Sequence, residues 1–540
     1  MYSETERSAF VASGKEVTTD DVIEELFRQR TWKYTLLLMS LMITWFNGPT
    51  AVYLTSFAGI DPTPETNWSC ISQKCQDYIT SNNSLLQEFP CKMTEEKNGK
   101  TELVLKSSDI KWEMTHSSFS VEFDLNCGVG SSKVLKTLLS SIVFAGGLTG
   151  LILGGFLYDH IGRKKTAVLG YFIAVLITFS GTFCHDYYFL LIIRFLQGLG
   201  MYLAFTGVYI MTVELVPVEQ KNYINGWAMC LWALGYPLAT AVGYLIPNWN
   251  YMFLAAAIII AVMNVQVLFC PEPPSFHVIN NDIESAKQSL KALQLLTDSK
   301  LDIDNIEISD AGKVRDRNQT VLRQLADLCS YPSLLLETSI LMFLWFFVGM
   351  AYYGFNFGWS SIVPNRYLGY LMASVGELIA YISAVPLIAR IGRRRAMMLM
   401  FVGAAIFYLI AIPEVKLGKN TDWTLESVSC LIGIIFVSGC FSGVYLWTAE
   451  LAPTSHRGFV FCVSSSSARI GSFLGPYIFN NLFPITHKAV PLGGLAVLAL
   501  LCALGSFILV ETGDKETALT GEDVVARRNL HRYRIFQTEK

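Results

Sequence analysis

Twelve blocks of apolar residues divide the sequence, and each is long enough to cross a lipid bilayer as an α-helix. About 20 apolar residues in a helix span a hydrocarbon core about 30 Å thick. The first block, 34–60, contains no Lys, Arg, Asp or Glu. Of the 540 residues, 52% are hydrophobic and only 16% are charged, whereas about 25% of a soluble protein is charged. The sequence therefore predicts an all-α membrane protein.

The predicted spans form two series of six on either side of a charged segment. The first series is 33–56, 136–157, 167–184, 188–213, 224–245 and 250–270, and the second is 334–357, 367–389, 396–413, 427–449, 459–481 and 490–510. The expected organisation is a cytoplasmic N-terminus (1–32), an N-terminal six-helix bundle (33–270) with an extracellular loop (57–135), a cytoplasmic linker (271–333) with a helix near 283–296, a C-terminal six-helix bundle (334–510) and a cytoplasmic tail (511–540).

The positions of Lys and Arg predict the orientation in the membrane. Short loops on the cytoplasmic side carry an excess of these residues. With the N-terminus inside, the short inner loops hold nine Lys and Arg and the short outer loops hold four. The first ten residues, MYSETERSAF, lack the basic and apolar regions of a signal peptide. Both termini are therefore expected in the cytoplasm.

The loop 57–135 has the features of a segment outside the cell. It contains four of the twelve cysteines, Cys70, Cys75, Cys91 and Cys127. Two disulfides among these four would require an oxidising compartment. The same loop has two glycosylation sequons, at Asn67 and Asn82. This prediction agrees with the orientation derived from the basic residues.

Short motifs recur in the two halves of the sequence at nearly the same offset. Residues 159–165 read DHIGRKK after the second span, and residues 391–395 read IGRRR after the eighth, an offset of 230 between the glycines. Glu-Leu-x-Pro ends the fourth span at Glu214 and the tenth at Glu450, 236 residues apart. The spacing favours an internal duplication.

The sixth and twelfth spans exit through a third matched pair, Glu272 and Glu511. A tight glycine turn followed by basic residues can pair with helix ends and carboxylates of a neighbouring bundle, and so latch one conformation. The alternative is that these positive charges only anchor the topology. The predicted latch residues are Asp159, Gly162, Arg163, Lys164, Glu214, Gly392, Arg393, Arg394, Glu450 and Arg457.

This pattern resembles the major facilitator superfamily and, within it, the family of organic cation, organic anion and carnitine transporters. The resemblance covers almost the whole chain. It rests on the large loop after the first span, the 159–165 motif, Arg194-x-x-x-Gly198-x-Gly200, the Glu-Leu-x-Pro ends and the long central segment. It implies a major facilitator fold at the plasma membrane that moves small organic ions by alternating access. The chain departs from the family at Ala389, opposite Asp159, where an acidic residue usually recurs.

Two ionisable residues inside predicted spans are candidates for substrate contact, because charges within a membrane are costly and usually functional. Arg469 lies roughly 15 Å into the eleventh span, about half the depth of the hydrocarbon core, and Glu377 is similarly deep in the eighth. Arg469 can bind a substrate carboxylate, or pair with Glu377 as a structural ion pair. In the resembled family this position is basic in the anion and carnitine branches and acidic in the cation branch, which implies anions or zwitterions.

Aromatic residues supply the remaining substrate candidates. Trp345 and Tyr352 are seven residues apart and share a helix face, and Tyr353 follows. Tyr381 aligns with a lysine in many organic anion relatives and with an aromatic residue in a carnitine-type relative. Such side chains can hold an apolar body or a quaternary ammonium. The alternative is ordinary helix packing and an interfacial aromatic belt.

Other functional classes find no support in the sequence. It contains no P-loop, no metal-spaced His/Cys cluster and no G-x-S-x-G motif, so neither enzymatic activity nor a cofactor is expected. The net charge of −3 and the lack of a long basic run argue against a nucleic-acid partner. The expected partners are a small organic ion and membrane lipid, with the monomer sufficient for function. The rival predictions are an organic cation transporter and a non-transporting receptor or scaffold of the same fold.

Overall fold

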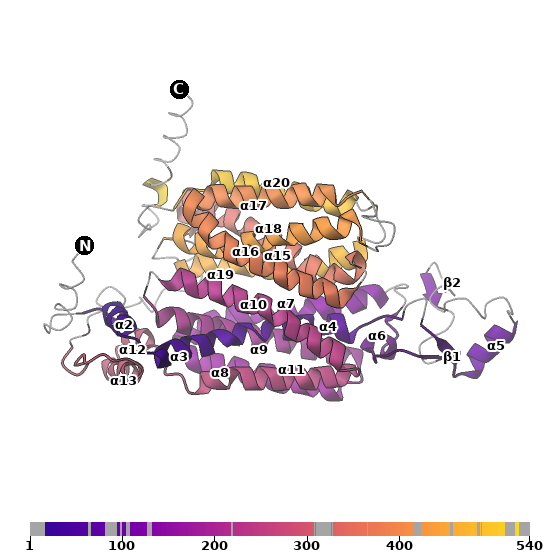
Figure 1. The fold of residues 1–540 in the computed structure, drawn as a ribbon, viewed down its shortest axis with the longest axis horizontal. Helices are drawn as coiled ribbons and strands as arrows, with labels where there is room; N and C mark the ends of the chain where they lie inside the picture. The colour runs from indigo at the N-terminus through magenta and orange to yellow at the C-terminus, as the bar shows by residue number, and fades with distance from the viewer. Residues whose placement is uncertain are drawn as a thin grey trace, which may run out of the picture.

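The protein consists of two adjacent helical bundles with smaller folded segments at both ends (Figure 1). The computed structural model describes residues 17–62, 66–81, 94–97, 100–103, 109–126, 132–217, 220–306, 308, 326, 328–363, 365–413, 423–453, 457–482, 487, 489–512, 524–526 and 528. We call the end from which the described residues between 57 and 135 extend the loop end, and the opposite end, near both described termini, the terminal end.

The N-terminal bundle contains six spans. They are α3 (Trp32–Met42) continued by η1 (Ile43–Trp45) and α4 (Gly48–Ala58), then α7 (Ser132–His160), α8 (Arg163–Ser180) with η6 (Gly181–Phe183), α9 (Tyr187–Glu214), α10 (Lys221–Leu245), and α11 (Trp249–Asn264) with η8 (Val265–Leu268). These limits lie within a few residues of those predicted from the apolar blocks.

The C-terminal bundle repeats this plan. Its spans are α15 (Pro332–Ile362), α16 (Arg366–Ile391), α17 (Arg393–Ile410), α18 (Leu425–Leu451), α19 (Arg457–Tyr477) with the π-helical η9 (Ile478–Leu482), and α20 (Ala489–Ile508). The bundles meet mainly through α10 against α16 and α7 against α19. The predicted arrangement of twelve helices in two groups of six is therefore observed.

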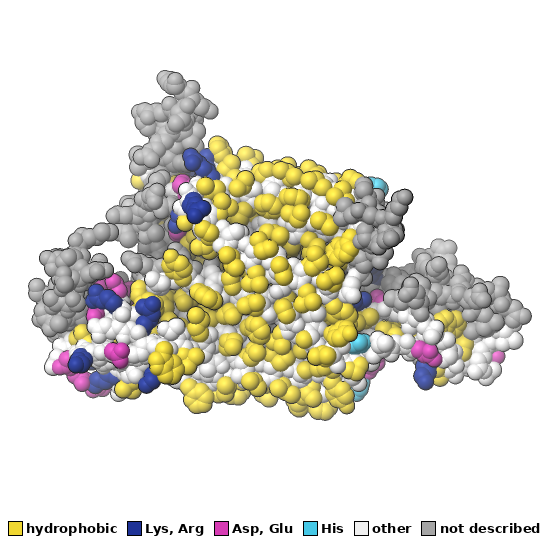
Figure 2. Space-filling view, viewed as in Figure 1, with side chains coloured by type: hydrophobic (Ala, Val, Ile, Leu, Met, Phe, Trp, Pro, Cys, Tyr) yellow, Lys and Arg dark blue, Asp and Glu magenta, His cyan; other side chains and the backbone are white. Residues whose placement is uncertain are grey.

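The surface of the bundles is suited to lipid. Figure 2 shows apolar side chains spread over the middle of the molecule, with charged side chains gathered near α2 and α13 and around the loop segments. Exposed Phe156, Leu176 and Leu504 belong to this surface. Among the described residues, ten helices are long and apolar enough to span a membrane by length and composition alone. Of the two others, α17 begins with three arginines and α19 contains the serine run 464–467.

A second apolar core lies at the terminal end, where the segment before the first span meets the linker. It joins α2 (Thr19–Arg28) and α13 (Ile283–Gln294), through residues such as Leu26 and Leu290, to the end of α9 and to η8. Helix α12 (Pro274–Ile279) lies between η8 and α13 in the sequence. The linker helix was predicted, whereas α2 was not. A capping box between Thr18 and Asp21 marks its start and was the available sequence signal.

The described part of the loop contains short elements and one disulfide. Strand β1 (Trp68–Cys70) pairs with β4 (Ile110–Trp112), β2 (Thr94–Lys97) pairs with β3 (Lys100–Leu103), and α5 (Gln73–Ser81) and α6 (Phe119–Glu122) complete the segment. Cys70 and Cys75 form a disulfide, and Asn67 is exposed. Cys91, Cys127 and Asn82 lie outside the described residues, so glycosylation and the second disulfide stay predictions.

Candidate functional site

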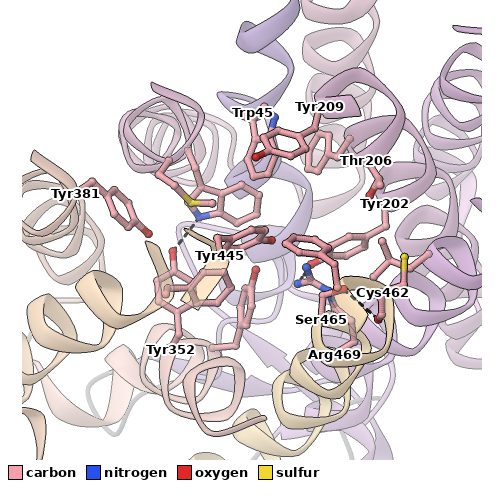
Figure 3. A pocket seen from close by; sticks show the side chains of 17 residues that line it. Trp45, Tyr202, Thr206, Tyr209, Tyr352, Tyr381, Tyr445, Cys462, Ser465 and Arg469 are labelled. Carbon is pink, nitrogen blue, oxygen red and sulfur yellow. Dashed lines mark hydrogen bonds between the residues drawn. The ribbon is translucent and has the colours of Figure 1, made fainter. Parts of the chain in front are cut away.

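A cavity lies between the two bundles, and both bundles contribute to its wall (Figure 3). Aromatic side chains dominate the lining. Its residues are Trp45, Leu151, Tyr202, Phe205, Thr206, Tyr209, Met229, Trp232, Tyr352, Tyr353, Tyr381, Phe441, Tyr445, Phe461, Cys462, Ser465 and Arg469. The predicted residues Arg469, Tyr352, Tyr353 and Tyr381 therefore meet in one cavity.

The cavity opens toward the terminal end. Its lining extends to Thr206 and Tyr209 in the terminal half of α9 and to Cys462 near the terminal end of α19, where the thiol is exposed. Toward the loop end the bundles close on each other through aromatic contacts: the rings of Tyr53 and Tyr370 have centroids 5.6 Å apart. The structure thus has one open side and one closed side.

Polar contacts reinforce the closed side. The Arg366 guanidinium donates to the Ser56 carbonyl at 3.3 Å, at the end of α4. The Asn481 amide donates to the Thr137 hydroxyl at 3.1 Å. Each of these bonds joins one bundle to the other, so the path to the loop end opens only if the bundles separate there.

The direction of opening predicts how the free cysteines react. In single-cysteine variants, we expect a charged, membrane-impermeant methanethiosulfonate to modify Cys462 when applied at the terminal end. Cys440 and Cys502 are buried within the C-terminal bundle and serve as matched controls that should stay unmodified. Mass spectrometry of the labelled protein gives the readout. Modification of Cys462 only from the loop end would contradict the observed opening.

Arg469 is the single charged side chain in the described lining of this cavity. It is 6% exposed, and its guanidinium donates to the Tyr202 hydroxyl at 3.0 Å and lies 4.3 Å from the centroid of the Tyr202 ring. Its Nε has no hydrogen-bond partner. A buried donor without an acceptor is costly. The side chain is therefore held by an aromatic ring while retaining an unused donor.

Arg194, from the Arg-x-x-x-Gly-x-Gly motif, is bonded quite differently. It is fully buried, and its guanidinium donates to the carbonyls of Ala51 and Val52 at 2.7 and 2.9 Å and to the Gln197 side chain. The two bonds to carbonyls join α9 to α4. Arg194 thus serves the packing of the N-terminal bundle, and among the buried arginines that the structure describes Arg469 is the one that faces the cavity.

Glu377 lies on the opposite side of the cavity from Arg469 and behind its wall. It has no exposure, and it accepts hydrogen bonds from Tyr236 at 3.0 Å and Tyr352 at 2.8 Å. Figure 3 places Tyr352 and Tyr381 on one side and Tyr202 and Arg469 on the other. Glu377 and Arg469 therefore do not form the ion pair that the sequence left open as an alternative, and Glu377 touches the cavity only through tyrosines.

Trp345 takes part in packing and does not line the cavity. Its indole N–H donates to the Thr448 hydroxyl at 2.9 Å, and its ring lies edge-on to Tyr445 with centroids 4.4 Å apart. For this residue the structure matches the packing alternative. Trp45, Tyr202, Tyr209 and Tyr445 also line the cavity and were not predicted from the sequence. Aromatic residues at 202, 205 and 209 recur at helical spacing, which was the one signal available.

The predicted latch motif forms a bonded cluster at the terminal end of the N-terminal bundle. Gly162 has φ +115, and a Cβ there would lie 2.7 Å from a Glu272 carboxylate oxygen. Glu272 accepts from the backbone N–H groups of Arg163 and Lys164, at the start of α8. The Arg163 side chain pairs with Glu214 at 3.3 Å. A carboxylate from the segment that follows η8 therefore caps α8.

The C-terminal bundle contains the same cluster. Gly392 has φ +86, and Glu511 accepts from the backbone N–H groups of Arg393 and Arg394 at 2.9 and 3.0 Å. The Arg393 guanidinium pairs with Glu450 at 2.8 Å. In both halves the carboxylates belong to the same bundle as the arginine, and not to the neighbouring bundle as predicted. The clusters thus brace helix ends within each half.

For two of the predicted latch residues, Asp159 and Arg457, the structure describes the backbone but not the side chain. Asp159 lies near the end of α7, and Arg457 begins α19, but their side chains are outside the described residues. Glu272 and Glu511 were recognised in the sequence as a matched pair and were not assigned to the latch. The positive φ of each glycine explains their role, because it turns the following N–H groups toward the carboxylate.

The sequence of the chain matches a known family over most of its length. The Major Facilitator Superfamily profile matches residues 115–476 and 367–536. Solute carrier family 22 member 7 of Bos taurus is 27% identical over 425 residues, which cover 76% of this chain and 75% of the relative. Solute carrier family 22 member 3 of Rattus norvegicus is 25% identical over 493 residues, 89% and 87% of the two chains. Organic anion transporter 3 of Rattus norvegicus is 26% identical over 428 residues, 78% and 77%.

Solved structures show the same fold. The proton:xylose symporter XylE bound to 6-bromo-6-deoxy-D-glucose superposes with a TM-score of 0.58 at 14% identity, over 91% of this chain and 98% of that chain. The inward open conformation of the xylose transporter XylE from E. coli gives 0.57 at 13% identity, over 91% and 99%. The predicted fold and the resemblance to organic ion transporters are confirmed. The chain belongs to the Major Facilitator Superfamily and is a multi-pass membrane transporter, not an enzyme.

Proposed function

We propose that the protein carries small organic anions that bear a carboxylate and an apolar or aromatic body, by alternating access. The observation that carries the proposal is the buried Arg469, which faces the cavity and has an unpartnered Nε. A guanidinium offers donors in a planar fork that matches a carboxylate. An anion in the cavity would supply the missing acceptor and neutralise the charge.

The other residues of the cavity wall indicate which chemical groups the substrate carries besides its carboxylate. Tyr202, Tyr445 and Trp232 present rings to the cavity, and these can pack against an apolar body. The Trp45 indole N–H is buried in the wall without a hydrogen-bond partner. A second unused donor favours a ligand rich in acceptors, as carboxylates and their ester or keto derivatives are.

Zwitterions such as carnitine-like compounds are the second candidate. Their positive group would need the negative charge of Glu377, which reaches the cavity only if Tyr352 or Tyr381 turns aside. Cation–π attraction to the tyrosine wall is a weaker substitute. Simple organic cations are disfavoured, because the single charge in the described lining is positive.

The transporter is proposed to act as a monomer in the plasma membrane, with both termini in the cytoplasm. The basic residues that begin α8 and α17 lie at the terminal end, as expected for a cytoplasmic face. The Cys70–Cys75 disulfide lies at the loop end, as expected for the oxidising side.

Uptake into proteoliposomes tests the proposal directly. Wild-type protein is assayed with three radiolabelled probes of similar size: an aromatic monocarboxylate, a quaternary ammonium and a carnitine-like zwitterion. We expect saturable uptake of the carboxylate, weaker uptake of the zwitterion and none of the quaternary ammonium above empty liposomes. Preferential uptake of the quaternary ammonium would overturn the anion assignment. Absence of any uptake, with binding retained, would support a receptor of the same fold.

A further inference from the structure

Glu377 is a buried carboxylate that bonds to both bundles at once. Tyr236 on α10 of the N-terminal bundle donates to one carboxylate oxygen at 3.0 Å, and Tyr352 on α15 of the C-terminal bundle donates to the other at 2.8 Å. The two tyrosine hydroxyls are also 2.9 Å from each other, and Tyr236 is 3.1 Å from the hydroxyl of Tyr53. The cluster therefore ties the bundles together through hydrogen bonds.

The cluster lies between the cavity and the closed loop end. Tyr53 and Tyr236 belong to the loop-end halves of their spans, and Tyr352 forms part of the cavity wall. The Ser374 hydroxyl, one turn from Glu377, donates to the Ala233 carbonyl of the other bundle at 2.8 Å. Because Tyr236 and Glu377 belong to different bundles, separation of the bundles at the loop end would part them and would admit water to the carboxylate. The surroundings of Glu377 thus change with the conformation.

No described cation compensates the charge of Glu377 in the closed arrangement. The titratable groups that face it are Tyr236 on α10, Tyr352 on α15, Tyr381 on its own helix and Tyr53 on α4. An ionised carboxylate buried in a membrane interior without a cation loses its hydration, and neutral hydroxyl donors restore only part of that loss. Burial therefore favours the protonated form, and exposure to water favours the ionised form.

We propose that Glu377 is a proton-binding site that couples anion transport to proton transport. Glu377 is ionised while the loop end is open and takes a proton from the solution at that side as the bundles close over it. The proton bonds to a carboxylate oxygen, which stays hydrogen-bonded within the tyrosine cluster. Release follows toward the terminal end when water reaches the carboxylate past Tyr352 and Tyr381 of the cavity wall. One proton then crosses with each monovalent anion held at Arg469.

Thermodynamic linkage between proton binding and conformation determines the direction in which pH changes transport. A conformation that binds the proton more tightly is itself favoured by protonation to the same extent. Low pH at the loop side therefore favours closure with the anion inside, and an acidic loop side should drive anion accumulation. Substitution of Glu377 by glutamine keeps the approximate shape of a neutral acid and one acceptor oxygen for the tyrosine hydroxyls, and it removes the titration.

The test rests on the proposed anion transport. It compares two modes of transport in proteoliposomes, namely uptake of the anion driven by a proton gradient and exchange of internal for external anion at equal pH. For wild type we expect a tenfold proton gradient, acidic at the loop side, to raise initial uptake of the aromatic monocarboxylate several-fold, with movement of protons reported by a trapped pH dye. For E377Q we expect the gradient to have no effect, while exchange of internal for external anion at equal pH continues. E426Q, a buried carboxylate in the first turn of α18, is the matched control and should keep the gradient response.

The outcomes separate the two proposals. Anion uptake by wild type that ignores the gradient, or a gradient response that survives in E377Q, overturns proton coupling at Glu377 and leaves anion transport standing. A wild type that moves no anion in either mode overturns the proposed function itself. A Y236F variant adds a second check, because it loses the hydrogen bond from Tyr236 to Glu377 across the bundles but keeps the carboxylate. We expect Y236F to retain the gradient response, with faster exchange of the loop end between open and closed.

Discussion

Replacing Arg469 by lysine is expected to raise the KM for an aromatic monocarboxylate about tenfold, and replacing it by alanine about 10- to 100-fold. Hydrogen bonds to charged groups contribute about 1.5–3 kcal/mol, and about 1.4 kcal/mol corresponds to a factor of ten. Lysine keeps the charge but loses the planar fork. Alanine loses both, and glutamate would repel the anion. Concentration-dependent initial uptake in proteoliposomes measures these changes.

Controls for Arg469 come from the residues that hold it. Tyr202→Phe removes the hydroxyl that accepts from the guanidinium at 3.0 Å and keeps the ring that lies against it. Because the charge stays in place, we expect a change in KM of only a few-fold. Each variant must also elute as a single species and be labelled normally at Cys462. An Arg469→Ala variant with unchanged KM for the anion would remove the central argument for anion transport.

The limits of the helices could be predicted closely, because every span must be apolar over the whole thickness of the hydrocarbon core. The block 188–213 predicts α9 within one residue at each end (Tyr187–Glu214), since charged or turn residues stop an apolar run where lipid stops. The predicted pairing of arginines with carboxylates across bundles was wrong. Sequence repetition shows that Arg163 and Arg393 occupy equivalent positions, but it contains no information on which bundle supplies their partners.

The cavity was predicted only in part, for a physical reason. In a soluble protein, apolar residues mark the buried face of a helix, whereas in lipid both faces are apolar. Trp45 and Tyr202 therefore looked like any other aromatic residues of their spans, although both line the cavity. Arg469 could be found because charge inside a membrane is costly on every face. Glu377 was found by the same reasoning, but its bonds to tyrosines of both bundles required the structure.

Replacing Gly392 by alanine is expected to lower the free energy of unfolding by about 2 kcal/mol or more. Gly392 has φ +86, where an L side chain is strained by about 1–3 kcal/mol. Its Cβ would also lie 2.6 Å from a Glu511 oxygen. The carboxylate would have to move away from the N–H groups of Arg393 and Arg394, leaving the start of α17 without its cap. A lower midpoint of thermal unfolding in detergent, at a fixed scan rate, is the measurement.

Gly493 on α20 provides the matched control, because a Cβ there would meet nothing within 4 Å. Alanine at this helical position should leave the midpoint unchanged or raise it slightly, since glycine in a helix interior is less favourable than alanine by about 0.5–1 kcal/mol. Glu511→Gln keeps an acceptor near the same N–H groups and removes the charge. It should therefore lower the midpoint of thermal unfolding less than Gly392→Ala does. If Gly392→Ala unfolds at the same temperature as Gly493→Ala, the cluster does not brace the helix. The cluster would then act in a step of transport in which the bundles move relative to each other. In that case Gly392→Ala would change the rate of transport and not the midpoint of unfolding.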